Sequence, residues 1–126
     1  MAYFAKIEEG VVTKVIAINN DVLNGGGAGF PDTEVTGQDY ISNVLNFSGD
    51  WKQTSYNSNF RFNYAGVGHT FQPESGTDGA FIPPQPFPSW ALDENLTWRP
   101  PVRYPLDSDQ ALNWDEEVQN WVSENE

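Results

Sequence analysis

The chain has 126 residues, 14% of them aromatic, and 18 acidic residues against 6 Lys and Arg give a net charge of −12. Such a chain repels phosphate backbones and anionic lipid, so its composition argues against nucleic-acid and membrane partners. Cys is absent, which excludes disulfides and thiolate metal sites. No apolar run indicates a signal peptide or a membrane helix of ~18 residues. We expect a soluble chain of ordinary domain size, made in a cytoplasm.

The first predicted element is a β-hairpin over residues 3–18, where β-prone side chains flank Glu9-Gly10. Gly10 can adopt the positive φ of a tight hairpin turn. Residues 19–29 are rich in Asn, Asp and Gly and predict a turn followed by a flexible loop. The glycine-rich stretch from Gly25 to Gly29 is not typical of a phosphate-binding loop, because no Lys-Ser/Thr pair follows it.

One α-helix is predicted from Thr36, which could cap its N-terminus with support from Asp39. Ser48-Gly49 predicts the end of this helix. An apolar stripe at helical spacing should pack against the sheet, and it consists of Tyr40, Ile41, Val44 and Leu45.

Four further strands are predicted between residues 51 and 82. Residues 51–56 alternate like a strand and residues 56–59 form a turn. In the next predicted strand Phe60, Phe62 and Tyr64 form an aromatic face, and Arg61 and Asn63 form a polar one. Residues 69–71 and 80–82 are expected to pair across the turn-rich residues 75–79.

Tryptophan pairs bracket two segments near the C-terminus, residues 90–98 and residues 114–121. Each holds an Asp-Glu turn signal, so each is predicted to be a hairpin that brings its two tryptophans together across the strands. Isolated hairpins are marginal in water, so these must pack on the main domain, on each other or on a partner. From Leu106 onward the chain has no Lys or Arg, so this tail is suited to a basic partner or to a self-packed hairpin with an acidic rim.

The fold class expected from these elements is mainly β, with antiparallel hairpins forming a small sheet or sandwich and one short α-helix. Residues 1–82 form the predicted β-rich core domain. Residues 83–126, which open with the polyproline-like PPQPFP, form a Trp/Pro-rich C-terminal hairpin lobe packed on it. A single compact unit is the alternative.

No catalytic constellation emerges from the residue pattern. His69 is the only histidine, and a lone His in an aromatic strand is usually structural. Asp107 and Asp109 match two positions of a calcium loop, but the required glycine and distal glutamate are missing. We therefore predict a protein that is not an enzyme and has no catalytic residue, no metal site and no cofactor.

Several segments together resemble a family of small proteins found in tailed phages of marine bacteria and cyanobacteria. The pattern runs through QTSYN (53–57), NYAG-G (63–68), P-PSW-LD (86–93) and W-PP (98–101), and the resemblance covers nearly the whole chain. The glycine-rich insert at 25–29 departs from it. Members are described as virion structural or hypothetical proteins, so the resemblance implies a component of the phage particle. The C-terminal residues also resemble the tryptophan-rich ends of some phage tail-fibre and fibre-assembly proteins.

The leading hypothesis is a capsid decoration, or cement, protein in the virion that binds the outer head surface, with the major capsid protein as its partner. The alternatives are a tail, fibre or neck accessory protein or a fibre assembly factor, and more remotely a wall-degrading accessory enzyme. Homo-oligomerisation is left open. The residues expected to contact the partner are Phe60, Phe62, Tyr64, Trp90, Trp98, Trp114 and Trp121.

Overall fold

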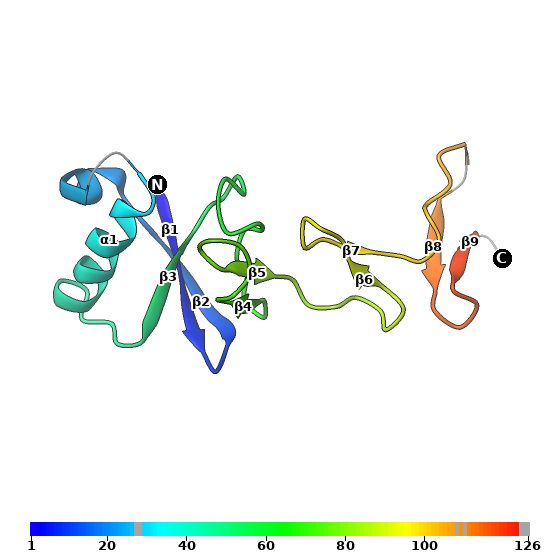
Figure 1. Cartoon of the computed structure of the whole chain (residues 1–126), viewed down its shortest axis with the longest axis horizontal. Coiled ribbons are helices and arrows are strands. Elements are labelled where there is room, and N and C mark those ends of the chain that lie inside the picture. Colours follow the sequence, from blue (N-terminus) through cyan, green and yellow to red (C-terminus); the bar gives the residue numbers. More distant parts are fainter. Residues whose placement is uncertain (27–28, 108, 110, 124–126) are drawn as a thin grey trace. The chain divides into compact units, whose positions relative to one another are not determined.

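The computed structural model describes residues 1–26, 29–107, 109 and 111–123. The chain divides into two compact units, Met1–Pro84 and Gln85–Glu126 (Figure 1). The first contains a five-stranded antiparallel sheet with one α-helix, and the second contains two small hairpins. The predicted fold class, mainly β with one short helix, is confirmed.

The sheet of the first unit has the strand order β3-β1-β2-β4-β5. The β1–β2 hairpin turns at Glu9 and Gly10, whose φ angles of 52° and 81° match the two positive φ values of a type I′ turn, as predicted. The predicted pairing of residues 69–71 with 80–82 is also present, because Phe71 lies opposite Phe81. The five strands are β1 (Ala2–Glu8), β2 (Val11–Ile18), β3 (Asp50–Thr54), β4 (Thr70–Gln72) and β5 (Ala80–Ile82).

The prediction for residues 19–29 was wrong over the part that the structure describes, since Asn20–Gly26 forms a 3-10 helix, η1. Residues 27 and 28 lie outside the described residues. The α-helix, α1, spans Asp32–Asn43 and so begins four residues before the predicted Thr36. Pro31 occupies the N-cap position, and acidic side chains in the first turn suit the positive end of the helix dipole.

The predicted helical stripe is only partly correct. Ile41 is fully buried, and Tyr40 and Leu45 pack against the core. Val44 is 60% exposed because the helix ends at Asn43, which places Val44 at the C-cap. The predicted stop at Ser48-Gly49 therefore lies in the segment that leads into β3.

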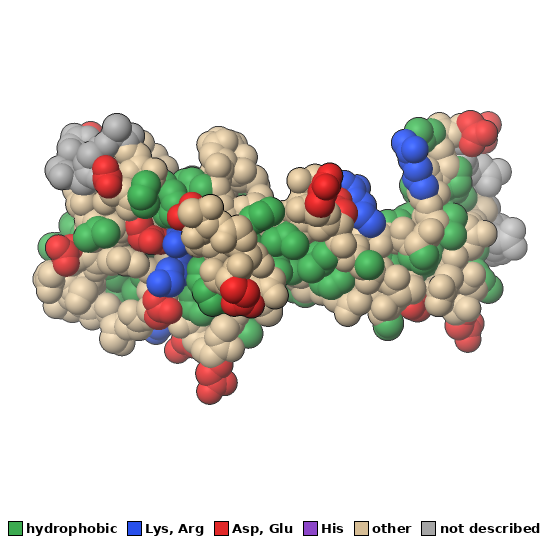
Figure 2. All heavy atoms as spheres, in the orientation of Figure 1, with side chains coloured by type: hydrophobic (Ala, Val, Ile, Leu, Met, Phe, Trp, Pro, Cys, Tyr) green, Lys and Arg blue, Asp and Glu red, His purple; other side chains and the backbone are tan. Residues whose placement is uncertain are grey.

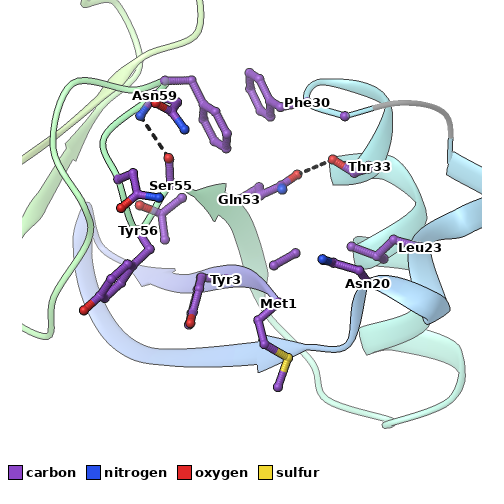
Figure 3. A pocket seen from close by; sticks show the side chains of 15 residues that line it. Met1, Tyr3, Asn20, Leu23, Phe30, Thr33, Gln53, Ser55, Tyr56 and Asn59 are labelled. Carbon is purple, nitrogen blue, oxygen red and sulfur yellow. Dashed lines mark hydrogen bonds between the residues drawn. The ribbon is translucent and has the colours of Figure 1, made fainter.

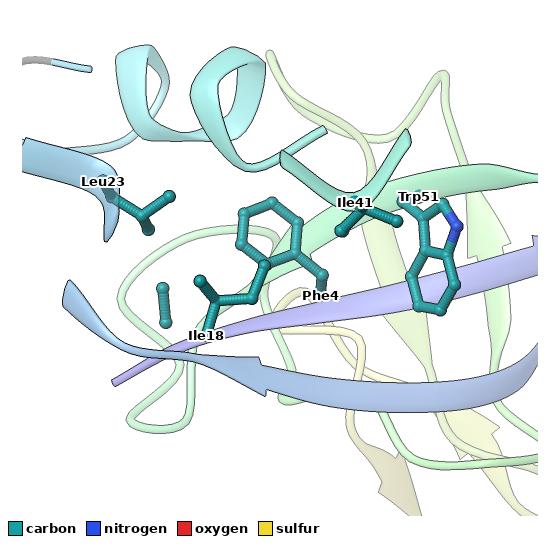
Figure 4. Close-up of a cluster of buried hydrophobic side chains, with 6 residues drawn as sticks. Phe4, Ile18, Leu23, Ile41 and Trp51 are labelled. Carbon is teal, nitrogen blue, oxygen red and sulfur yellow. The ribbon is translucent and has the colours of Figure 1, made fainter. Parts of the chain in front are cut away.

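The main core lies between α1, η1 and one face of the sheet. Figure 4 shows Phe4 and Ile18 from the hairpin, Leu23 from η1, and Ile41 and Trp51 from α1 and β3 meeting in one cluster. Helix and sheet approach closely because position 37 is a glycine. A Cβ at Gly37 would overlap the ring of Phe4, with its two Cε atoms only 2.6 and 2.7 Å away.

The predicted strand at residues 60–64 is not formed. Arg61 and Phe62 have left-handed backbone φ angles of 58° and 67°, which break the strand, and Phe62 makes only an isolated bridge to Phe81. The predicted faces are also reversed at these two positions. Arg61 is buried with 9% of its surface exposed, whereas Phe62 is 37% exposed.

Arg61 is held from several directions. Its guanidinium forms a forked ion pair with Glu34 of α1, with Nη2 lying 3.2 Å from Oε1. Nη1 also donates to the Gln53 carbonyl at 2.8 Å, and Nε donates to the Asp78 carbonyl at 2.8 Å. The guanidinium carbon lies 4.8 Å from the ring centre of Phe30. Left-handed residues cost about 1–3 kcal/mol each, and this set of bonds maintains the conformation.

Residues 61–63, here called the Arg61 segment, bond to both edge strands of the sheet, β3 and β5. On β3, the Gln53 carbonyl accepts from Arg61, and the Gln53 N–H donates to Glu34 at 2.7 Å. On β5, the Phe81 N–H donates to the Arg61 carbonyl at 3.1 Å, and its carbonyl accepts from Asn63 Nδ2 at 2.9 Å. The outward-facing backbone groups of Gln53 and Phe81, one residue on each edge strand, are thus bonded within the unit.

The second unit contains the two predicted tryptophan hairpins. Asp93 and Asp115 stand at the two turns, and each accepts hydrogen bonds from backbone N–H groups of its own turn. The residues of PPQPFP (83–88) form neither helix nor strand. The four strands are β6 (Ala91–Leu92), β7 (Trp98–Arg99), β8 (Leu112–Asp115) and β9 (Asn120–Ser123).

We predict that Gly37→Ala destabilises the first unit by at least about 1 kcal/mol. Helix propensity alone favours Ala by about 1 kcal/mol. The added methyl group would overlap three atoms of the fully buried Phe4 ring, so the overpacking cost lies at or above the upper end of its usual range of about 1–3 kcal/mol and exceeds that gain. Urea unfolding followed by the amide NMR signals of Met1–Pro84 measures the change. Val35→Ala, on the exposed face of the same helix, is the control and should change stability by under about 0.5 kcal/mol. A Gly37→Ala variant that is more stable than the unmodified chain would contradict the close approach of α1 to the Phe4 ring.

Glu34→Gln is expected to cost the first unit about 3–5 kcal/mol, because it leaves the buried Arg61 guanidinium without its counter-charge. Glu8→Gln is the matched control. Glu8 lies 3.9 Å from Lys6, and its side chain is 55% exposed, so its loss should cost under about 1 kcal/mol. If both variants lose the same stability in the urea experiment, the Arg61–Glu34 ion pair contributes no more than an exposed ion pair.

Candidate functional site

Aromatic rings form the centre of the second unit. The rings of Trp114 and Trp121 face each other across the β8–β9 hairpin, as predicted, with centroids 5.3 Å apart and planes at 72°. Trp90 stands edge-on to Trp114 at 5.8 Å and lies 6.3 Å from Trp121. Tyr104 adds an edge contact to Trp121 at 4.8 Å. Such T-shaped pairs stabilise by about 0.5–1.5 kcal/mol each beyond the burial of area.

The first hairpin is paired differently from the prediction. Trp98 lies opposite Leu92, not opposite Trp90, because the register matches Ala91 with Arg99. Trp90 therefore precedes the two-residue strand β6, and its ring joins the second hairpin instead. The two hairpins thus pack on each other through Trp90, which is one of the alternatives that the sequence left open.

Glu116 ties the two parts of this unit together. Its carboxylate accepts from the Ser89 N–H at 3.0 Å, from the Ser89 hydroxyl at 2.7 Å and from Trp114 Nε1 at 2.9 Å. These bonds, the one from Trp114 first, hold the pKa of Glu116 below its ordinary value of 4.5. The Arg99 guanidinium, 2.9 Å from Asp93 Oδ2, is the main cause of a lowered pKa at Asp93.

A cleft of about 620 Å³ opens beside the aromatic centre. Its most exposed apolar side chain is Leu106, at 79%. Trp121 Nε1 donates to the Val102 carbonyl at 2.8 Å, which holds the segment carrying Tyr104 against the hairpin. The lining residues are Trp90, Trp98, Arg99, Pro100, Arg103, Tyr104, Leu106 and Trp121.

The two basic residues of segment 85–126 both line this cleft, although the segment carries nine acidic residues. Arg99 is paired with Asp93. Within the described part of the chain, Arg103 makes no ion pair. On the face shown in Figure 2 the acidic side chains are scattered and not gathered into one patch. A ligand of this cleft would therefore meet apolar rings beside a free positive charge.

The seven predicted contact residues are divided between the two units. Trp90, Trp98 and Trp121 line the cleft of the second unit, and Trp114 packs behind them in the aromatic centre. Phe60, Phe62 and Tyr64 belong to the first unit and point to different neighbours. Phe60 stacks on Phe30 at 4.0 Å, and Tyr64 contacts Tyr3 and Tyr56. Arg99, Arg103, Tyr104 and Leu106 were not predicted, although the run PVRYPL does combine prolines, a cation and apolar side chains.

His69, the single histidine of the sequence, was predicted to be structural and not catalytic. His69 is half-buried, its Nδ1 has no hydrogen-bond partner in the described structure, and burial lowers its pKa. Among the described residues no cluster of three or more His, Asp or Glu side chains could hold a metal ion. In the same part of the chain no helix is both long and apolar enough to cross a membrane.

The lowered pKa of Glu116 predicts how the second unit responds to acid. Because protonation is disfavoured in the folded state, the carboxylate's contribution is complete above about pH 4.5 and is lost as the pH falls through the lowered pKa. Glu116→Gln should therefore lower the urea midpoint of Gln85–Glu126 at pH 7, with a smaller difference from the unmodified chain at pH 3. Glu117→Gln, at an exposed neighbour, is the control. If Glu116→Gln lowers the urea midpoint equally at pH 7 and pH 3, the charged form of Glu116 does not stabilise the second unit.

Comparisons of the chain with known protein families, with curated proteins and with solved structures found no match in any of the three.

Proposed function

We propose that the chain is a structural component of a tailed-phage virion and not an enzyme, namely a decoration protein that binds the outer surface of the head. The cleft of the second unit is its contact surface, and the major capsid protein is its partner. The observation that carries this proposal is the cleft walled by Trp90, Trp98 and Trp121, with Leu106 and Arg103 exposed at it. The resemblance of the QTSYN, NYAG-G, P-PSW-LD and W-PP segments to phage proteins supports the virion location.

The composition of the cleft is that of an interface centre. Trp, Tyr and Arg are the residue types that dominate binding energy at protein interfaces. The tryptophans are already fixed by each other, so little side-chain entropy is lost when a partner covers them. Leu106 has no such support and gains the most from being covered, at about 25 cal/mol for each Å² of apolar area removed from water.

A partner that is repeated in a capsid lattice can raise the affinity of binding through a small interface. Eight described residues line the cleft, whereas a standard interface of ~800 Å² per partner involves about 20–30 residues a side, so neighbouring residues of the second unit must add area. Where the partner is present in many copies, rebinding at adjacent sites raises the apparent affinity without new contacts. A net charge of −12 also keeps unbound copies apart.

We predict that Leu106→Asp weakens binding to phage heads at least about tenfold, because it places a charge in the apolar contact, a loss of about 1.4 kcal/mol. Val118→Asp is the matched control, since Val118 is also an exposed apolar residue of the second unit (62%) but does not line the cleft. The measurement is co-sedimentation of the purified chain with heads that lack it. Equal binding by both variants would show that the partner does not use this cleft.

Copy number in purified particles separates the head from the alternatives. Hundreds of copies for each particle support decoration of the head. A dozen or fewer support a tail, fibre or neck protein, for which the tryptophan-rich second unit is the favouring feature. Complete absence from particles supports a fibre assembly factor and contradicts the proposed role.

A further inference from the structure

A second cleft, of about 460 Å³, lies in the first unit where the end of β3 meets the starts of β1 and α1. Figure 3 shows Tyr3 and Tyr56 on one side of it and Phe30 on another, with amide side chains between them. Its volume lies within the ~300–1,000 Å³ of small-molecule pockets. The proposed function does not use this cleft.

The described side chains that line this cleft carry no charge, and many of them are polar. Of its described lining residues none is Asp, Glu, Lys, Arg or His, although charged residues make up 19% of the chain. Asn20, Gln53 and Asn59 contribute amide groups around it, and Asn57 adds a fourth. Amides both donate and accept hydrogen bonds, so these groups suit a ligand that carries many neutral hydroxyls. Among the described lining residues, the α-amino group of Met1 is the one cation that a phosphate or carboxylate ligand could meet.

The aromatic rings of the cleft are held in place. Tyr56 is 64% exposed, yet its ring stacks on Tyr3 at 5.7 Å with an angle of 29° between the planes. Tyr64 stands edge-on to Tyr56 at 5.2 Å. On the other side Phe30 and Phe60 stack at 4.0 Å with planes 4° apart. Fixed rings lose little entropy when a ligand packs on them.

From these observations we infer that this cleft binds a neutral oligosaccharide. A sugar ring has an apolar face of C–H groups that packs on Tyr56, and its neighbouring hydroxyls match the paired donor and acceptor of an amide. Gln53 is partly engaged, since its Oε1 accepts from the Thr33 hydroxyl at 2.9 Å. That bond fixes its orientation. Asn57 and Asn59 are exposed and available to a ligand.

The test is a titration of the full isotope-labelled chain, followed by its amide NMR signals. The probes are malto-, cello-, xylo- and chito-oligosaccharides, with oligogalacturonate as the anionic probe. We expect saturable shifts at residues 53–60 with at least one neutral probe, and weaker binding or none with oligogalacturonate. Either the absence of saturable shifts with all four neutral probes or tighter binding of oligogalacturonate would overturn the inference.

Substitutions locate the binding. Tyr56→Ala should weaken it at least about tenfold, whereas Tyr56→Phe keeps the stacking ring and should stay within about threefold. Asn57→Ala should also weaken it, and Asn43→Ala, at the exposed end of α1 away from the cleft, should not. If the Tyr56→Ala variant loses its dispersed amide spectrum and so is unfolded, the comparison of binding by Asn57→Ala with binding by Asn43→Ala tests the site instead. Binding unchanged by the cleft substitutions would refute this site, and it would leave binding of the second unit to phage heads unaffected.

Discussion

The Arg61 guanidinium is the point on which the first unit depends. It is almost fully buried, and burying a charge is costly unless the charge is paired and its donors are bonded. Here Glu34, the Gln53 carbonyl and the Asp78 carbonyl meet that need together. The planar fork of arginine can reach a helix, a strand and a loop at once, which a lysine ammonium could not do with the same geometry.

The second unit uses a related device with the charges reversed. Glu116 binds a residue 27 positions earlier in the chain, just as Arg61 binds Glu34 at the same separation. In both units a carboxylate thus joins segments that local structure alone would leave apart. Asp93 and Asp115 serve their own turns in the same way. Part of the acidic surplus of the chain is therefore structural, and not simply a solubilising charge.

Local patterns predicted the elements whose causes are local. Glu9-Gly10 placed the first turn, and the two Asp-Glu signals placed the C-terminal hairpins. The strand expected at residues 60–64 failed because the backbone of Arg61 is set by Glu34 and Asp78, which lie far away in sequence. The helix start was missed because Pro31 with acidic residues after it is a start signal of its own, which the Thr36 cap obscured.

The two clefts were harder to predict for the same reason. Tryptophans stood out in the sequence as the main feature of the C-terminal segment, and three of them line its cleft. Leu106 and Arg103 line the same cleft only because the chain between the two hairpins lies against Trp121. Sequence periodicity does not encode that placement. The cleft of the first unit gathers residues from β1, η1, α1, β3 and the 55–60 loop, and no single segment suggests it.

The Arg61 segment bonds to both edge strands, and this affects which residues of the first unit can be substituted during evolution. The outward backbone groups of Gln53 on β3 and Phe81 on β5 are already bonded within the unit, so they are not open to pairing with a further strand. Tyr56 and Asn57 are exposed and lie outside the strands, so they can be exchanged one at a time while the hydrogen-bonded ladder stays intact. The surface chemistry of the first unit can thus change by single substitutions that leave its sheet in place.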